Sequence, residues 1–297
     1  MNTFFSKSLP VEVVFHPSWW YKNTGITFDS DFFYHPLKRV ESEQRMEREL
    51  YERFGDLGLG ETHRNTLPVI GAVHNAAGYL LSEMLGCEIR YFENQAPQVV
   101  CAHRDELTVS PDAALKNAAF KRLNTLVETL KSKFGYVTGD VNWGGILNLA
   151  IDLRGEEMLM DMMLQPDKSQ KFFDEIATVI EGFTTYIATN TSTTSVSVNS
   201  IVRHAEKPIF LHSECTHTMI SDDLYEQLLL PADIKWSAEH RPYGIHFCGR
   251  DPHRFAEQFA KIPHLDFLDL GWGGDVKLLR EKLPNTFFSI RLDPVTI

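Results

Sequence analysis

Cysteine is scarce in this chain, with four residues among 297. Cys87, Cys101, Cys215 and Cys248 are too few and too scattered for a disulfide framework, so we expect free thiols in a reducing compartment. A buried thiol often serves only as a small hydrophobe, and the apolar runs beside Cys87 and Cys101 fit that use. Cys215 and Cys248 differ because each has histidines close by.

Positive charge is in deficit, since 29 Lys and Arg face 40 Asp and Glu and give a formal net charge of -11. Polyanion binding needs a dense basic patch, so we expect neither nucleic acid nor an anionic membrane as a partner. No stretch approaches the roughly 18 apolar residues of a membrane-spanning helix, and the first residues lack the apolar core of a signal peptide. The sequence therefore predicts a cytoplasmic protein.

Nucleotide-binding motifs and boundary signals are also absent. No G-x-G-x-x-G or G-x-x-x-x-G-K-[ST] follows an expected strand, which weakens a nucleotide-binding doubly wound fold. Nothing resembles an internal repeat or a Pro/Ser-rich linker. We therefore predict one domain over residues 1–297, with a mainly helical N-terminal extension at 1–95 and repeated βα units at 96–297.

Strands and helices alternate regularly beyond residue 110, which indicates βα units and a parallel sheet. Several expected strands end in polar residues or glycine, where a (β/α)8 TIM-type barrel carries its chemistry. Pro166 separates two further helices. The expected strands cover 136–143, 207–214, 243–249, 265–272 and 286–294, and the expected helices cover 114–135, 221–240, 251–262 and 275–284.

The strand over 243–249 carries the first candidate metal ligands. Alternation along a strand places His246 and Cys248 on the same face, and Gly249 opens a turn beside them. An imidazole nitrogen and a thiolate sulfur would thus reach one metal ion. The alternative is a strand with an incidental His and Cys.

The sequence "HSECTH" at 212–217 offers further donors at the end of the preceding strand. Alternation places His212 and Glu214 on one face, with Cys215 at the start of the loop. Glu214 is a candidate ligand or acid–base group and Cys215 a candidate ligand, whereas we expect His217 to be structural. The alternative is that Glu214 or Thr216 caps the helix beginning near 221.

Other strand ends supply candidate substrate contacts. Asp140 is a candidate for hydrogen bonding to a substrate and for a catalytic role, and Asn142 and Trp143 follow it, the indole as an apolar wall. Turn chemistry explains Asp140 and Asn142 equally well. Asp269 and Asp293 end later strands and are candidate polar contacts.

The order of these motifs resembles the uroporphyrinogen decarboxylase superfamily, whose members share a distorted (β/α)8 barrel. The resemblance runs from about Tyr136 to Pro294 and rests on residues 136–173, 220–236, 246–250, 267–284 and 290–294. The decarboxylases carry an arginine-bearing motif of the type R-Q-A-G-R, which this sequence lacks. His246 and Cys248 instead form an H-x-C sequence similar to that of the zinc-dependent methyltransferase branch.

The resemblance implies that His246 and Cys248 bind Zn²⁺ and that the enzyme moves a methyl group between a small methylated compound, or a thiol, and a corrinoid (cobalamin) carried on a partner protein. That branch places its third ligand, a Cys, after the "LDP" segment, where this sequence has none. Either the chain is a fragment lacking its last βα unit or the site is completed otherwise, and Cys215 is the ligand we select.

Two alternatives remain open at this stage. One is a metal-free decarboxylase acting on an acidic tetrapyrrole, which the missing arginine motif and the negative charge disfavour. The other is a barrel without turnover that binds a ligand or a partner. Zinc content separates both from the methyltransferase.

Overall fold

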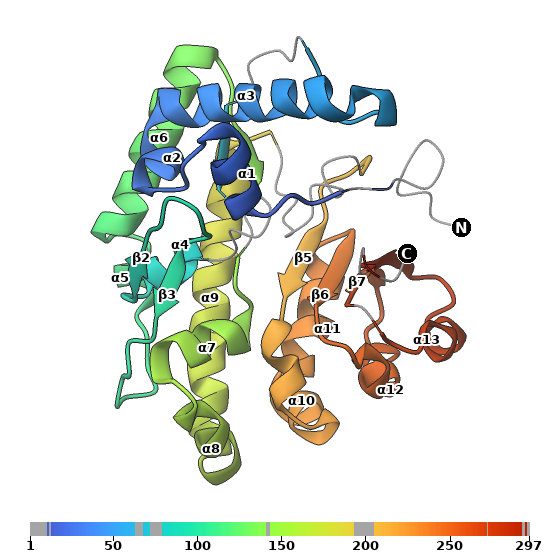
Figure 1. Ribbon diagram of the computed structural model, residues 1–297. Helices are drawn as coiled ribbons and strands as arrows, with labels where there is room; N and C mark the ends of the chain where they lie inside the picture. The colour runs from blue at the N-terminus through green and yellow to red at the C-terminus, as the bar shows by residue number, and fades with distance from the viewer. Residues whose placement is uncertain are drawn as a thin grey trace.

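The computed structural model describes residues 11, 13–62, 68–71, 79–140, 143–192, 205–271, 273–292 and 295. Helices and short parallel strands alternate through most of this length (Figure 1). The mixed α/β class expected from the sequence is therefore confirmed.

Capped helices come first in the described part of the chain. They are α1 (Pro17–Thr24), α2 (Ser30–Tyr34), α3 (Pro36–Phe54) and the 3-10 turn η1 (Gly55–Leu57). The Asp29 carboxylate accepts from Phe32 N and so caps α2, and His35 Nδ1 accepts from Lys38 N and caps α3. α3 ends at Phe54, with Gly55 as its C-cap.

The second half of the N-terminal extension contains strands as well as helices. Its elements are β1 (Val69–Gly71), α4 (Tyr79–Met84), β2 (Glu88–Arg90) and, just after it, β3 (Gln98–Val100). β2 and β3 pair antiparallel. β1 was not expected.

A group of helices covers the middle of the chain. They are α5 (Pro111–Ala114), α6 (Ala118–Phe134), α7 (Ile146–Arg154), α8 (Glu157–Leu164) and α9 (Pro166–Asn190), with β4 (Thr138–Asp140) between α6 and α7. α6 ends at Gly135, which has φ 79°. Pro166 begins α9, as predicted, because proline fits the first turn of a helix but not its interior.

Strands and helices then alternate to the end. The elements are β5 (Phe210–Ser213), η3 (Cys215–Met219), α10 (Asp222–Leu228), α11 (Leu230–Glu239), β6 (Tyr243–Phe247), η4 (Pro252–Phe255), α12 (Ala256–Phe259), β7 (Leu265–Leu270), α13 (Val276–Lys282) and β8 (Phe287–Ile290). The single helix predicted over 221–240 was wrong. It is two helices that meet at Leu229, because Pro231 lacks the N–H that would continue α10.

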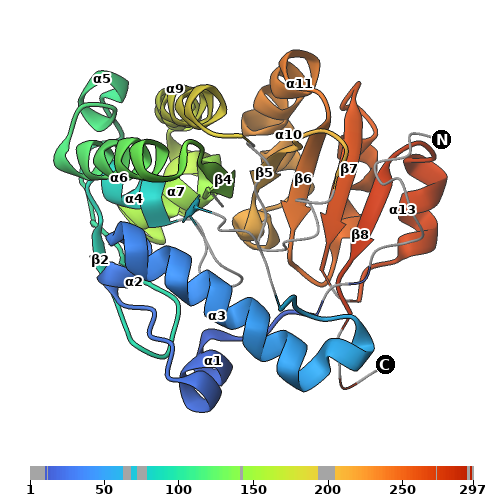
Figure 2. The same ribbon diagram turned by 90° about the horizontal axis from the view of Figure 1, so that it is seen from above.

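The parallel strands form two sheets in the described part of the chain. One has the order β5-β6-β7-β8 and the other pairs β1 with β4. A backbone hydrogen bond of 2.7 Å from Gly145 N to Ser213 O joins the segment after β4 to β5. Figure 2 shows β4 and β5 to β8 following one another across the molecule, with α9 and α11 on one side and α3 on the other. The described strands do not close into a ring, so the barrel stays a prediction.

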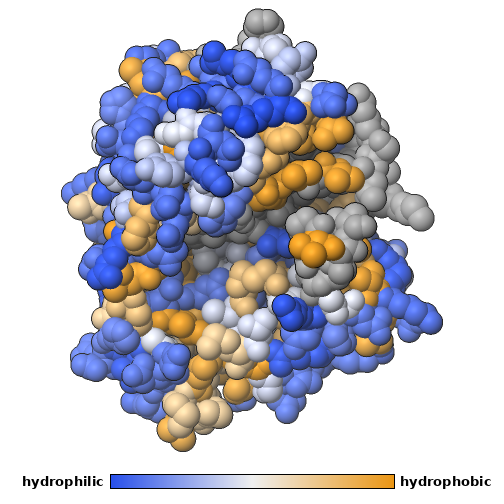
Figure 3. Space-filling view, in the orientation of Figure 1, coloured by the Kyte–Doolittle hydropathy of each residue, from blue (hydrophilic) through white to orange (hydrophobic). Residues whose placement is uncertain are grey.

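Burial follows the apolar runs of the sequence. Every residue of β6 and β7 is buried, as expected for parallel strands covered on both faces. Figure 3 shows hydrophobic side chains at the lower tip of the molecule, where α8 exposes Met160, Met163 and Leu164. Within the described ranges, we find no helix with the length and hydropathy needed to cross a bilayer.

Candidate metal centre

Three soft donors meet at the carboxyl ends of β5 and β6. The ligand atoms of Cys215, His246 and Cys248 all lie within 4.8 Å of one another. Cys215 begins η3 two residues after the end of β5, and Cys248 directly follows β6. Parallel neighbours end at the same edge, which is why residues 33 positions apart converge here. The three residues could hold a metal ion.

The ring of His246 is oriented by Asp269. The two residues are direct partners in the register of β6 and β7, and His246 Nδ1 lies 2.6 Å from Asp269 Oδ2. A carboxylate at this distance accepts a hydrogen bond from Nδ1–H and favours the tautomer in which Nε2 has a free lone pair. That Nε2 atom is buried and has no hydrogen-bond partner among the described residues. A metal ion would satisfy it.

Arg291 completes the arrangement behind His246. Its Nη2 atom lies 3.0 Å from Asp269 Oδ2 and 3.1 Å from His246 Nδ1, and its side chain is 29% exposed. Burial disfavours ionised Asp269, but the charges of His246 and Arg291 outweigh that effect and lower the pKa of its carboxyl group. Asp269 therefore stays an anion and a strong acceptor.

The thiols of Cys215 and Cys248 lie close enough to affect each other's ionisation. A hydrogen bond from Cys215 lowers the pKa of Cys248 to about 4, and the same contact raises the pKa of Cys215. Cys248 is exposed and Cys215 partly buried, so solvent reaches one side of the cluster. One nitrogen and two sulfur donors with an open side fit zinc, which accepts three protein ligands and keeps a fourth position for a substrate.

A buried polar network lies beside this cluster. His212 Nε2 is 3.0 Å from Glu214 Oε1, and His212 Nδ1 is 2.6 Å from Asp233 Oδ1. Tyr225 donates its hydroxyl to Asp233 over 2.6 Å, and the Tyr243 hydroxyl does likewise. All five side chains are essentially inaccessible to solvent.

The charges of this network explain how it is tolerated in the interior. Burial acts to lower the pKa of His212, but the Asp233 and Glu214 carboxylates outweigh it and raise that pKa to about 9. The imidazolium in turn lowers the pKa of both carboxyl groups against the opposing effect of burial. The network therefore places one imidazole between two carboxylates, and each carboxylate favours the charged form of the imidazole.

The other residues predicted from the sequence lie in varied surroundings. Trp143 is buried in an aromatic cluster, with its ring 5.6 Å from that of His212 and 5.1 Å from that of Phe210. His217 is buried against the ring of Tyr225, and a structural role for it stays a prediction. Substrate contacts by Trp143 and Asp269 stay predictions.

Asp140 lies in β4 by its backbone, and its side chain is outside the described part of the structure. Asn142 and Asp293 lie entirely outside the described part of the structure. A catalytic role for Asp140 and substrate contacts by the other two remain predictions.

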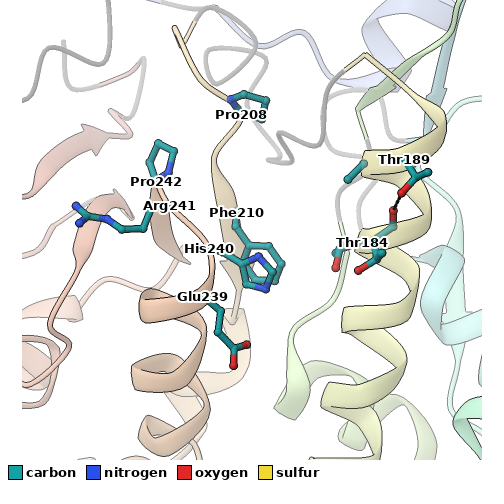
Figure 4. Close-up of a pocket in the computed structure, with 10 residues that line it drawn as sticks. Thr184, Thr189, Pro208, Phe210, Glu239, His240, Arg241 and Pro242 are labelled. Carbon is teal, nitrogen blue, oxygen red and sulfur yellow. Dashed lines mark hydrogen bonds between the residues drawn. The ribbon is translucent and has the colours of Figure 1, made fainter.

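A cavity lies away from the cluster, at the amino ends of β5 and β6. It has a volume of about 300 Å³ and opens between α9 and the end of α11 (Figure 4). His240 stacks on Phe210 within it, with ring centroids 4.2 Å apart. None of the residues predicted from the sequence as site residues lines this cavity.

Three residues around the cluster were missed from the sequence: Arg291, Asp233 and Asn148, whose side chain bonds Ser213 O and Thr216 N on either side of Cys215. Arg291 directly follows β8, and a polar residue at a strand end was the available signal. Asp233 and Asn148 are on helices, where a single polar residue on an apolar face gives no distinct pattern.

Comparison with known proteins supports the fold. No protein-family model matches the chain, and no curated protein matches it. Among solved structures, a methyltransferase from Methanosarcina mazei is similar over 84% of this chain and 67% of its own, with 14% sequence identity and a TM-score of 0.58. At this identity the likeness concerns the fold alone.

Proposed function

We propose that this protein is a zinc-dependent methyltransferase that moves a methyl group between a small methylated substrate or thiol and a corrinoid protein. The observation that carries the proposal is the convergence of Cys215, His246 and Cys248 at the carboxyl edge of a parallel sheet. The fold that the chain shares with a methyltransferase supports the same class of enzyme.

The described residues would have distinct roles in metal binding and substrate activation. His246 Nε2 and the two thiolates would hold the ion, while Asp269 fixes the imidazole from behind. Zinc, when bound, supplies Lewis-acid activation of a coordinated oxygen, nitrogen or sulfur. The exposed side of Cys248 leaves room for a small thiol or methylated compound to approach.

The surroundings of the site complete the proposal. Trp143 and Asn142 would bound the substrate, with Asp293 as a polar contact, and Asp140 would assist proton transfer. A cytoplasmic location, where the four thiols stay reduced, belongs to the same proposal, and the described cysteines are all free. The partner would be the protein that carries the corrinoid.

A transfer assay tests this function. The purified protein is mixed with methylcobalamin and a panel of small thiols, and the absorbance of cobalamin is followed as the methyl group passes to sulfur and leaves cob(I)alamin. We expect His246→Ala and Cys248→Ala to lose most of the rate, and Cys101→Ala to keep it. Equal rates in all four proteins would contradict the proposal.

A further inference from the structure

Glu214, the residue just before Cys215, holds its carboxylate against the first turn of α7. Oε1 accepts from Leu147 N at 2.9 Å, and Oε2 lies 3.4 Å from Asn148 N. These are backbone N–H groups that the helix itself cannot satisfy, and they carry the positive end of its dipole. The side chain of Glu214 is fully buried in this position.

Asn148, in the first turn of α7, holds the chain on both sides of Cys215. Its Nδ2 donates to Ser213 O at 2.8 Å, and its Oδ1 accepts from Thr216 N at 3.0 Å and from Thr216 Oγ1 at 2.7 Å. The residues two before and one after Cys215 are thus fixed to the same helix.

The backbone of Glu214 also contacts the strand that carries the other ligands. Glu214 N donates to His246 O at 3.0 Å, which continues the pairing of β5 with β6 past Ser213. Cys215 therefore leaves the sheet from a point that is fixed to β6 on one side and to α7 on the other.

The close fit of Glu214 against α7 depends on Gly145. A Cβ atom at Gly145 would lie 2.4 Å from Glu214 Cδ and 2.6 Å from Ser213 O. Its backbone has φ -71°, which any residue adopts, so glycine is required here for space alone. Gly144 is different, because a Cβ there would meet only side chains, at 3.3 Å and beyond.

We infer that the start of α7 and Glu214 together form a clamp that positions the Cys215 thiol beside His246 and Cys248. Gly145 and Asn148 contribute the α7 side of this clamp, and the Glu214 carboxylate binds to it. Glu214 acts in it as a positioning residue, because its oxygens are already occupied by α7 and by His212. The inference rests on the proposed metal site, to which it assigns the support of the third ligand.

Gly145→Ala tests the clamp, because it changes neither a ligand nor Glu214 and acts only through space. The cobalt(II)-loaded protein reports thiolate ligands through its sulfur-to-cobalt charge-transfer absorption. We expect Gly145→Ala to lose about half of this absorption and to bind metal roughly 10-fold to 100-fold more weakly, a loss typical of disturbed support around metal ligands. Gly144→Ala is the matched control and should keep both values.

The possible outcomes distinguish failure of the clamp hypothesis from failure of the proposed metal site. If the unmodified protein binds no cobalt or zinc, the proposed function and the inference fall together. If it binds metal and Gly145→Ala binds it equally well with the same spectrum, only the inference is wrong.

Glu214→Gln supplies a second test that does not depend on the folding of Gly145→Ala. Glutamine keeps an oxygen for Leu147 N but cannot exchange a proton. The amide places an NH2 group against Asn148 N, where Glu214 Oε2 lies, so a clamp predicts that the cobalt charge-transfer absorption and the transfer rate fall together. An unchanged spectrum with the transfer rate lost would show an acid–base role and overturn the assignment of Glu214.

Discussion

His246 is the residue on which the candidate centre depends most, because its two ring nitrogens have different surroundings. Nδ1 faces a buried carboxylate, whereas Nε2 is buried without a hydrogen-bond partner among the described residues, and the ring lies beside the two thiols. A carboxylate behind a ligating imidazole fixes its tautomer and raises its basicity. The metal affinity of the site should therefore depend on Asp269, which is not itself a ligand.

Asp269→Asn should weaken zinc binding by roughly 10-fold to 100-fold, because the amide is a poorer acceptor for Nδ1–H. Competition with a chromophoric chelator measures the affinity. Asp266→Asn is the control on the same strand, since Asp266 bonds Arg241 and Tyr243 N instead. Equal affinities in both variants would contradict the role given to Asp269.

His212 should make stability depend on pH. Folding raises its pKa from 6.5 to about 9, so its contribution is complete below about pH 6.5 and is lost as the pH rises toward 9. The difference corresponds to at most roughly 3 kcal/mol.

Urea unfolding with a chelator present, at pH values from 6.5 to 9, measures this contribution. The free energy of unfolding should fall over this range, and it should fall less in Asp233→Asn, which removes one of the two anions beside His212. A flat profile for the unmodified protein would show that His212 does not titrate as described.

At the residue scale, the sequence predicted which Cys and His residues lie together better than it predicted the residues that support them. Strand alternation was sufficient to place His246 and Cys248 together, and nearness to a strand end was sufficient to suggest Cys215. Asn148 and Asp233 were not predictable, because their contacts join residues 68 and 21 positions away, respectively. Long-range pairing of this kind leaves no periodic signal in one sequence.

At the scale of helices and strands, end signals were the most reliable guide. Gly135 ends α6 in the left-handed region, and Ser221 caps α10 by accepting from Leu224 N, as its position suggested. The break inside 221–240 was missed because the apolar pattern continues across Leu229, and η4 shortened the helix expected over 251–262. Local hydrogen-bond geometry determined where these two helices break or end, and hydrophobic spacing does not encode that geometry.

Gly135→Ala should lower the free energy of unfolding by about 1 to 2 kcal/mol, because φ 79° is strained for a residue with a Cβ atom. Gly135→Asn should lower it less, since asparagine tolerates this conformation better. Chemical denaturation of the three proteins measures the order. Alanine that is as stable as glycine would contradict the account of this helix end.

At the scale of the whole molecule, the parallel arrangement of β5 to β8 brings the site together. It sets the carboxyl ends of these strands side by side, so residues separated in sequence by a complete helical crossover share one edge. Repeated βα units were predictable from the alternation of apolar runs and helical segments. Whether the strands close into a barrel was not predictable, because closure depends on pairing between the two sheets.

The amount of zinc bound by the purified protein tests the central claim most directly. Elemental analysis should find about one zinc per chain, and the value should fall to near zero in Cys215→Ser, in His246→Ala and in Cys248→Ser, while Cys101→Ser keeps it. No bound zinc in the unmodified protein after zinc is supplied, or undiminished zinc in the three ligand variants, would contradict the account.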